Sequence, residues 1–313
     1  MHRTRTESAV FVIASIAIGL VTLDAVAWVA GFDHIIARVH ELNPIWFLVA
    51  LGAEGVAYVG YVFAYREVSR VESGPEMGAG DALAAVAAGF GPFVARGGFA
   101  LDVHAFKQTG VSDHDVRVRV FGLGALEYAL LAPAACAAAI VLLAEGVKTP
   151  SWALTMPWAI AVPLGFVGAL WAVDHRHRFR IESLLGQALE SIHVLRCMFV
   201  RPRHLIGPIG AAVYWFGDIV CLWACLEAFT HGTPDVALLL IGYATGYALS
   251  RRTLPLAGAG AVEALLPFAL SWCGISLAAA VLAVAAYRVF NLWLPTVPAA
   301  LGMRRLRAAQ QAS

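Results

Sequence analysis

The chain has 313 residues, of which 60% are hydrophobic and 14% are charged, and its mean hydropathy is +0.74. Soluble domains are about 45–50% apolar and about 25% charged, so this composition argues against a soluble domain and indicates a polytopic membrane protein. The net charge is +1 and no lysine or arginine run is interleaved with aromatic residues, so we expect no nucleic-acid partner.

The first apolar run, residues 9–32, follows Arg3 and Arg5 and contains an Ala-x-Ala sequence at 25–27, as a signal peptide does. The apolar part of a signal peptide is about 7–15 residues long, whereas this run is about as long as a bilayer requires. We therefore expect an uncleaved first transmembrane helix.

Apolar stretches of about 20 residues, the length that spans a bilayer, recur along the whole chain. In lipid, only helices and closed barrels satisfy their backbone hydrogen bonds. The pattern predicts an all-α, polytopic membrane helix bundle with about eight transmembrane helices. The predicted spans are residues 8–31, 45–64, 117–144, 153–173, 205–230, 235–250, 254–273 and 276–298.

A further apolar segment, residues 81–101, contains four glycines and a proline around Arg96. These residues interrupt a straight helix, so we predict a broken or re-entrant element. Residues 8–144 and 205–298 share the order span, span, broken segment, span. Transporters are often built from structural repeats of this kind, and a repeat is one interpretation of this order.

Lysine and arginine gather in alternate loops, and such loops are retained on the cytoplasmic side of the membrane. The richest loop, residues 174–203, is then cytoplasmic. If 81–101 enters and leaves from that side, eight crossings of the cytoplasmic (inner) membrane place both termini in the cytoplasm. A re-entrant 254–273 would instead place the basic end of the chain outside.

We predict one transmembrane domain over residues 1–303, followed by a basic cytoplasmic tail, 304–313. Within the domain, residues 174–204 form an amphipathic cytoplasmic connector, because apolar residues recur at helical spacing from Ile181 to Phe199. This helix could lie among lipid headgroups or pack on the bundle as a simple connector. Both interpretations fit the sequence.

Charged side chains inside the predicted spans cost about 2.5 to more than 10 kcal/mol at the bilayer centre, so they usually face a cavity or a partner. Asp24 and Glu227 lie near span ends, where we expect them at the interface. Glu54, Glu127 and Asp218 lie deeper. We expect each of these three to pair helices through a hydrogen bond or to carry protons.

The sequence LPLAGAGAVEALLPFAL at 254–270 places Gly258, Gly260 and Glu263 inside an apolar run. The glycines allow another backbone to approach closely. The interrupted helix also leaves polar backbone groups that need a buried or aqueous environment. We interpret this motif as a binding site for substrate.

Two deep arginines, Arg96 and Arg288, are the expected partners of Glu263. A guanidinium group binds carboxylates and phosphates alike. An arginine that pairs with Glu263 at rest could therefore exchange it for a lipid phosphate. The alternative is a permanent ion pair that locks two helices together.

Motifs for nucleotide binding or hydrolysis are absent from the sequence, which contains no G-x-x-x-x-G-K, G-x-S-x-G or H-E-x-x-H. The five cysteines form no C-x-x-C pair. His114, His175 and His177 lie in charged loops without a complete ligand set. We therefore expect no catalytic residue, no metal site and no cofactor.

Three segments carry a resemblance to a known family: LPLAGAGAVEALL at 254–266, GISLAAAVLAVAAYRVFNLWLP at 274–295 and ARGGFALDVHAFKQTGVS at 95–112. With the order of spans over nearly the whole chain, they resemble the lysylphosphatidylglycerol synthase transmembrane region, also called the flippase-like domain. That family commonly has Pro-Gly-Gly where this chain has Leu256, Ala257 and Gly258, so the local turn differs.

The resemblance implies a transporter that moves aminoacylated or otherwise modified phospholipids between leaflets, while a separate cytoplasmic domain makes the modification. We see no such domain after Pro298, so we expect a standalone, non-enzymatic member. Its partners would be membrane lipids and a separate lipid-modifying enzyme. Arg96 and Arg288 would hold the phosphate, and Glu263 would release and recapture them.

Two other functions are consistent with the same sequence. The chain could be a non-transporting membrane subunit that binds lipid or scaffolds a biosynthetic enzyme through residues 174–204. It could also be an enzyme acting on a lipid-linked sugar, which would need a catalytic carboxylate facing the headgroup region.

Overall fold

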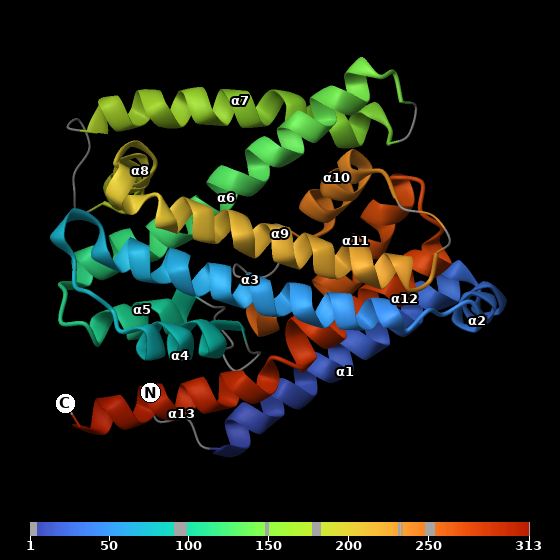
Figure 1. Ribbon diagram of the computed structural model, residues 1–313, viewed down its shortest axis with the longest axis horizontal. Helices are drawn as coiled ribbons and strands as arrows, with labels where there is room; N and C mark the ends of the chain where they lie inside the picture. Colours follow the sequence, from blue (N-terminus) through green and yellow to red (C-terminus); the bar gives the residue numbers. More distant parts are fainter. Residues whose placement is uncertain are drawn as a thin grey trace.

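The computed structural model describes residues 5–90, 99–147, 150–176, 183–230, 232, 234–247 and 254–312 of the chain. Every regular element in these ranges is a helix, and most of the long helices run roughly along the longest axis of the molecule (Figure 1). The predicted all-α architecture is therefore confirmed. Arg96 of the predicted site, with the centre of the predicted broken segment, lies outside the described residues.

Six stretches in the described part of the chain are long and apolar enough to cross a membrane, as a polytopic membrane protein requires. The last of them is a composite of several helical pieces. The stretches are built from α1 (Arg5–Ala30), α3 (Ile45–Arg70), α6 (Asp113–Ala144), α7 (Trp152–Asp174), α9 (Ile206–Glu227), and the run of α12 (Leu277–Arg288), η5 (Val289–Trp293) and α13 (Thr296–Ala312).

The other α-helices are shorter and lie between or beside the long ones. They are α2 (Phe32–His40), α4 (Ala79–Phe90), α5 (Phe99–Lys107), α8 (Leu184–Val200), α10 (Val236–Gly246) and α11 (Ala261–Trp272). Short 3-10 turns are η1 (Val71–Ser73), η3 (Pro202–His204) and η4 (Pro255–Gly258).

Two predicted spans, 235–250 and 254–273, contain helices that are shorter than expected. These helices, α10 and α11, have 11 and 12 residues. At about 1.5 Å per residue, neither covers the ~30 Å hydrocarbon core of a bilayer. α11 begins late because Gly258 and Gly260 have φ angles of +70° and +86°, which interrupt a right-handed helix.

The predicted span 276–298 and the predicted tail 304–313 are built from several helical pieces. α12 passes into the π-helix η5, and α13 begins at Thr296, directly after Pro295. α13 continues through the residues predicted as a tail and packs along α4. The domain boundary predicted at residue 303 thus falls inside a helix of the bundle.

α3 and α9 form the most extensive helix pair and lie at the centre of the molecule (Figure 1). A Cβ atom at Gly210 would lie 2.6 Å from the carbonyl oxygen of Gly60, and one at Gly217 would lie 2.5 Å from that of Ala53. Small residues allow such close packing between membrane helices. The pair holds four buried carboxylates inside the bundle, Glu54 and Glu67 on α3 and Asp218 and Glu227 on α9.

The predicted connector helix exists as α8, and it buries polar as well as apolar residues. Gln187 and Ser191 are buried. Leu184 and Leu185, from the predicted apolar face, are 73% and 53% exposed. In a membrane, exposed apolar side chains can contact lipid, so the apolar face need not pack on protein.

Candidate functional site

A hydrogen-bonded polar network lies inside the bundle between α9, α10, α12 and η5. Its centre is Asp218 of α9, which has no exposed surface. Asp218 accepts hydrogen bonds from the hydroxyls of Tyr243 and Tyr287, the latter at 2.9 Å, and from Nδ2 of Asn291 at 2.6 Å. These three donors satisfy a carboxylate that would otherwise be costly to bury.

An ion pair extends the network to α11. Nε of Arg288 donates to Oε1 of Glu263 at 2.7 Å, and neither side chain has exposed surface. Arg288 also donates to Oδ1 of Asn291 at 3.5 Å, so Asn291 connects the pair with Asp218. The structure therefore brings together Glu263, Arg288 and Asp218 of the predicted site residues.

Glu263 also determines how α11 begins. The N–H of Gly260 donates to Oε2 of Glu263 at 2.8 Å, so the carboxylate caps the first turn of its own helix. Gly260 lies so close to α1 that a Cβ atom there would be 2.8 Å from Cγ2 of Ile18. Gly258 and Gly260 thus allow a left-handed turn against α1. Glu263 uses one oxygen for the cap and the other for Arg288.

η5 lies between the polar network and a surface groove that is lined by α3, α4 and α13. A π-helix contains an extra residue in its turn, which changes locally which side chains share a face, and such elements are frequent at functional sites. Asn291 is 1% exposed and joins the network. Its neighbours Phe290 and Leu294 line the groove. A shift in η5 would therefore alter both regions together.

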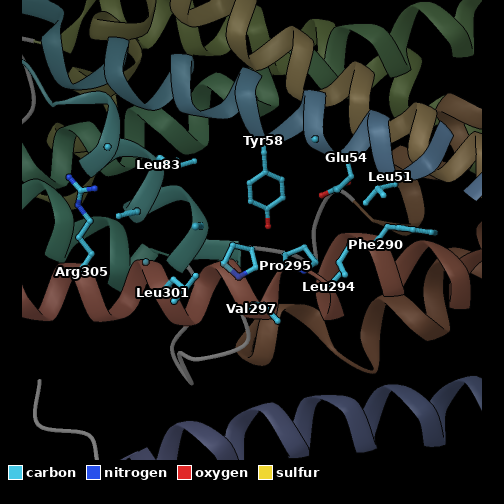
Figure 2. Close-up of a pocket in the computed structure, with 16 residues that line it drawn as sticks. Leu51, Glu54, Tyr58, Leu83, Phe290, Leu294, Pro295, Val297, Leu301 and Arg305 are labelled. Carbon is cyan, nitrogen blue, oxygen red and sulfur yellow. The ribbon is translucent and has the colours of Figure 1, made fainter. Parts of the chain in front are cut away.

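The groove lies between α3, α4 and the η5–α13 run and has a volume of about 700 Å³ (Figure 2). Ligand sites are typically about 300–1,000 Å³. Its apolar lining includes Leu83, Val297 and Leu301, which are 53%, 67% and 59% exposed, so it opens sideways toward the surrounding lipid. Tyr58 points into the space from α3, and Glu54, which is 4% exposed, lies beside it.

One end of the groove is charged. Arg305 of α13 lines it and pairs with Asp81 of α4 at 2.9 Å, with both side chains exposed. A Cβ atom at Gly80 would lie 2.8 Å from an Nη atom of Arg305, so the glycine lets the guanidinium lie against α4. Arg305 and Asp81 also line an adjoining polar pocket of about 290 Å³. An apolar groove that meets a charged pocket matches the layout of an amphipathic lipid.

Glu127, another predicted carboxylate, links three long helices. It is 6% exposed, and its Oε1 accepts a hydrogen bond from the hydroxyl of Tyr61 on α3 at 2.5 Å. Nε1 of Trp215 on α9 donates to its backbone carbonyl at 2.9 Å. This geometry fits the helix-pairing role considered for Glu127 from the sequence.

Asn291 and three tyrosines were not predicted from the sequence as members of the network. Tyr243 of α10 and Tyr247, the residue after its last helical residue, are four apart, and Tyr287 and Asn291 are four residues apart on either side of Arg288. Tyr247 donates to Oδ1 of Asn291 at 3.1 Å, which joins the two pairs. Residues four apart share one face of a helix. Two such polar pairs inside apolar helices were therefore a usable indication of a buried polar stripe.

No family model matches the chain, and no curated protein matches it significantly. Function is therefore inferred from the groove, the charged pocket and the buried network.

Proposed function

We propose that this chain is a flippase-like membrane transporter that moves a phospholipid or a lipid-linked headgroup between leaflets. The observation that carries the proposal is the apolar groove of about 700 Å³ that ends at Arg305 and Asp81. The lipid tails would occupy the groove, in contact with the bilayer, and the headgroup would occupy the charged end. The sequence resemblance to the lysylphosphatidylglycerol synthase transmembrane region points to the same class of function.

The charged pocket supports a headgroup that carries both signs of charge. Arg305 would bind a phosphate, because guanidinium groups form strong hydrogen bonds with phosphate oxygens. Glu76 and Asp81 line the same pocket and would accept hydrogen bonds from an ammonium group. A phosphate next to an amine satisfies both kinds of side chain.

The buried network would act as the conformational element of transport. Glu263 and Arg288 have no exposed surface, so a lipid phosphate cannot reach them until η5 moves. We propose that this movement presents Arg288, together with Arg96, to the phosphate, while Glu263 releases the guanidinium and later recaptures it. The turn at Gly258 and Gly260 would allow the change in backbone.

The proposed topology has about eight crossings of the cytoplasmic membrane, a re-entrant segment at 81–101, and both termini in the cytoplasm. Basic residues at one end of the bundle support it, since the ends of α3, α7 and α13 and the starts of α6 and α9 meet there (Figure 1). Arg70, Arg117, Arg203 and Arg305 belong to this end. Loops rich in arginine stay in the cytoplasm.

The test is leaflet-resolved movement of fluorescent phospholipids in liposomes that contain the purified protein. Zwitterionic, anionic and lysyl-modified lipids are compared for wild type and for Glu263→Gln, which cannot hold Arg288 by charge. We expect wild type to move at least one of these lipids and Glu263→Gln to lose more than about tenfold in rate. That loss corresponds to the ~1.4 kcal/mol of one charged contact. A wild-type protein that is folded by size-exclusion chromatography but moves none of them would contradict the proposal.

A lipid-binding or scaffolding subunit that does not transport is the second candidate. Exposed apolar residues of α8, including Leu184 and Val200, favour it, because they form a face at the basic end of the bundle. Such a face could hold another membrane protein. Lipid bound in the groove without any movement between leaflets would support this candidate over transport.

A further inference from the structure

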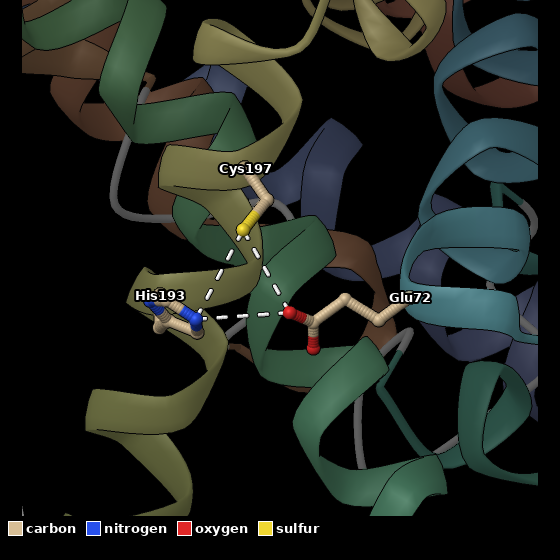
Figure 3. Close-up of side chains that lie close together, drawn as sticks. All are labelled: Glu72, His193 and Cys197. Atoms are coloured by element: carbon tan, nitrogen blue, oxygen red, sulfur yellow. Dashed lines mark hydrogen bonds and ion pairs between the residues drawn. The ribbon is translucent and has the colours of Figure 1, made fainter.

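Three side chains with metal-binding atoms converge where the end of α3 meets α8 (Figure 3). Oε1 of Glu72 lies 3.7 Å from Sγ of Cys197 and 3.7 Å from Nε2 of His193. Sγ of Cys197 lies 4.0 Å from Nε2 of His193. Cys197 is buried, whereas the side chains of His193 and Glu72 are 29% and 38% exposed. The cluster is thus reachable from solvent on one side.

The three distances are close to those of a tetrahedral zinc site. Zn–S bonds of about 2.3 Å and Zn–N and Zn–O bonds of about 2.0–2.2 Å place the ligand atoms roughly 3.4–3.6 Å apart in a tetrahedron. The observed separations of 3.7–4.0 Å exceed this by a few tenths of an ångström. Small side-chain rotations would therefore complete the geometry.

The local backbone positions each of the three groups. His193 and Cys197 are four residues apart on α8, so they share one face. Glu72 lies in η1 with φ 54° and ψ 46°, a left-handed conformation that is rare for residues other than glycine. This conformation turns its carboxylate toward α8 (Figure 3). The sequence predicted no metal site, since its cysteines form no C-x-x-C pair, and Glu72 is 125 residues from Cys197 in the chain.

We propose that Glu72, His193 and Cys197 bind a divalent transition metal of the zinc class, with the fourth position open to water or another ligand. Thiolate and imidazole together are ligands that suit zinc, and three protein ligands with one open position are usual for reactive zinc sites. The metal would tie the end of α3 to α8. This site is separate from the lipid groove and does not depend on the proposed transport function.

Arg176 gives the proposal a distinctive consequence. Its Nη1 lies 3.3 Å from Nδ1 of His193, and its side chain is exposed. When Nε2 of His193 binds a metal, Nδ1 carries the proton, and a guanidinium cannot accept it. Arg176 must therefore move away into solvent. Replacing Arg176 removes a cation that competes with the metal for His193 and should strengthen metal binding. If Arg176 only stabilised the fold, its replacement would not strengthen metal binding.

The test is titration of the purified full-length chain, in detergent micelles, with Co²⁺ as a spectroscopic substitute for zinc. We expect one Co²⁺ per chain, a thiolate-to-cobalt charge-transfer band, and loss of that band when Zn²⁺ is added. Cys197→Ser should lose the band, and His193→Gln, which keeps the thiolate, should weaken Co²⁺ affinity more than about tenfold. Cys136→Ser, which removes a buried cysteine of α6, is the matched control and should leave the band unchanged.

Arg176→Gln keeps the test decisive if a ligand variant fails to fold. Removing one exposed like charge should tighten Co²⁺ binding by about two- to fivefold. Absence of the band in folded wild type, or an equal band in Cys197→Ser, would overturn the metal site. Unchanged or weaker binding in Arg176→Gln would contradict the predicted competition at His193.

Discussion

Arg288 and Glu263 are oppositely charged and fully buried, so each depends on the other for its stability in the bundle. Removing one partner of a buried pair leaves an uncompensated charge and costs about 3–5 kcal/mol. Arg288→Met should therefore lower the free energy of unfolding by about that amount, measured by denaturation in detergent micelles.

Arg305→Met is the matched control for this substitution, because its pair with Asp81 is exposed and such pairs contribute about 0–1 kcal/mol. Equal effects of the two substitutions would contradict the closed, fully buried network.

Gly260 combines a positive φ angle with close contact to α1, and these two effects can be separated. Gly260→Ala should cost the strain of a left-handed residue, about 1–2 kcal/mol, plus a clash with Ile18. Gly274 has φ +94° but no atom within 4 Å of an added Cβ, so Gly274→Ala should cost the strain alone. Comparison of the two melting temperatures checks this, and a larger drop for Gly274→Ala would speak against it.

At the scale of single residues, the sequence predicted that Glu263, its neighbouring glycines and Arg288 lie together, because a charge in an apolar run needs compensation. Asn291 was not predicted, because an uncharged polar residue in an apolar run was not singled out, although it lies four residues after Tyr287. The Glu72 cluster was also not predicted, since a left-handed residue in a turn leaves no periodic pattern.

At the scale of helices, the α3–α9 pair depends on small residues at its closest contacts. A Cβ atom at Gly217 would lie 2.5 Å from the carbonyl oxygen of Ala53, which is backbone and cannot rotate away. Gly217→Ala should therefore separate the helices and cost about 1–3 kcal/mol. Gly165 of α7 has no atom within 4 Å of an added Cβ, so Gly165→Ala should be neutral or stabilising by up to about 1 kcal/mol. Equal unfolding free energies for the two variants would contradict close packing.

Helix existence was predictable from the sequence, but helix length and orientation were less so. Hydropathy located the long spans, because lipid selects apolar runs. It overestimated α11, because residues 255–258 form a 3-10 turn and Gly260 precedes the helix; α10 ends at Gly246, and residues 248–250 of its predicted span lie outside the described residues. For α8 the periodicity located the helix but did not decide whether its apolar residues contact protein or lipid, because either environment accepts them.

At the scale of the molecule, the groove and the network share the wall formed by η5, although their residues come from distant parts of the chain. The groove joins α3, α4 and α13, and the network joins α9, α10, α11 and α12. Hydropathy could predict the bundle but not this arrangement, because it does not determine which helices are neighbours. Because both regions meet at η5, a shift of this element would alter the groove and the ion pair together.

Blocking the groove tests the central claim most directly, by the rate of lipid movement in liposomes. Gly55 lines the groove and Gly52 does not, and an added Cβ at either position meets no atom within 4 Å. Gly55→Leu should fill the groove and reduce the rate more than about tenfold, while Gly52→Leu, one turn away on α3, should keep the wild-type rate. Equal rates for both folded variants would contradict passage of lipid through this groove.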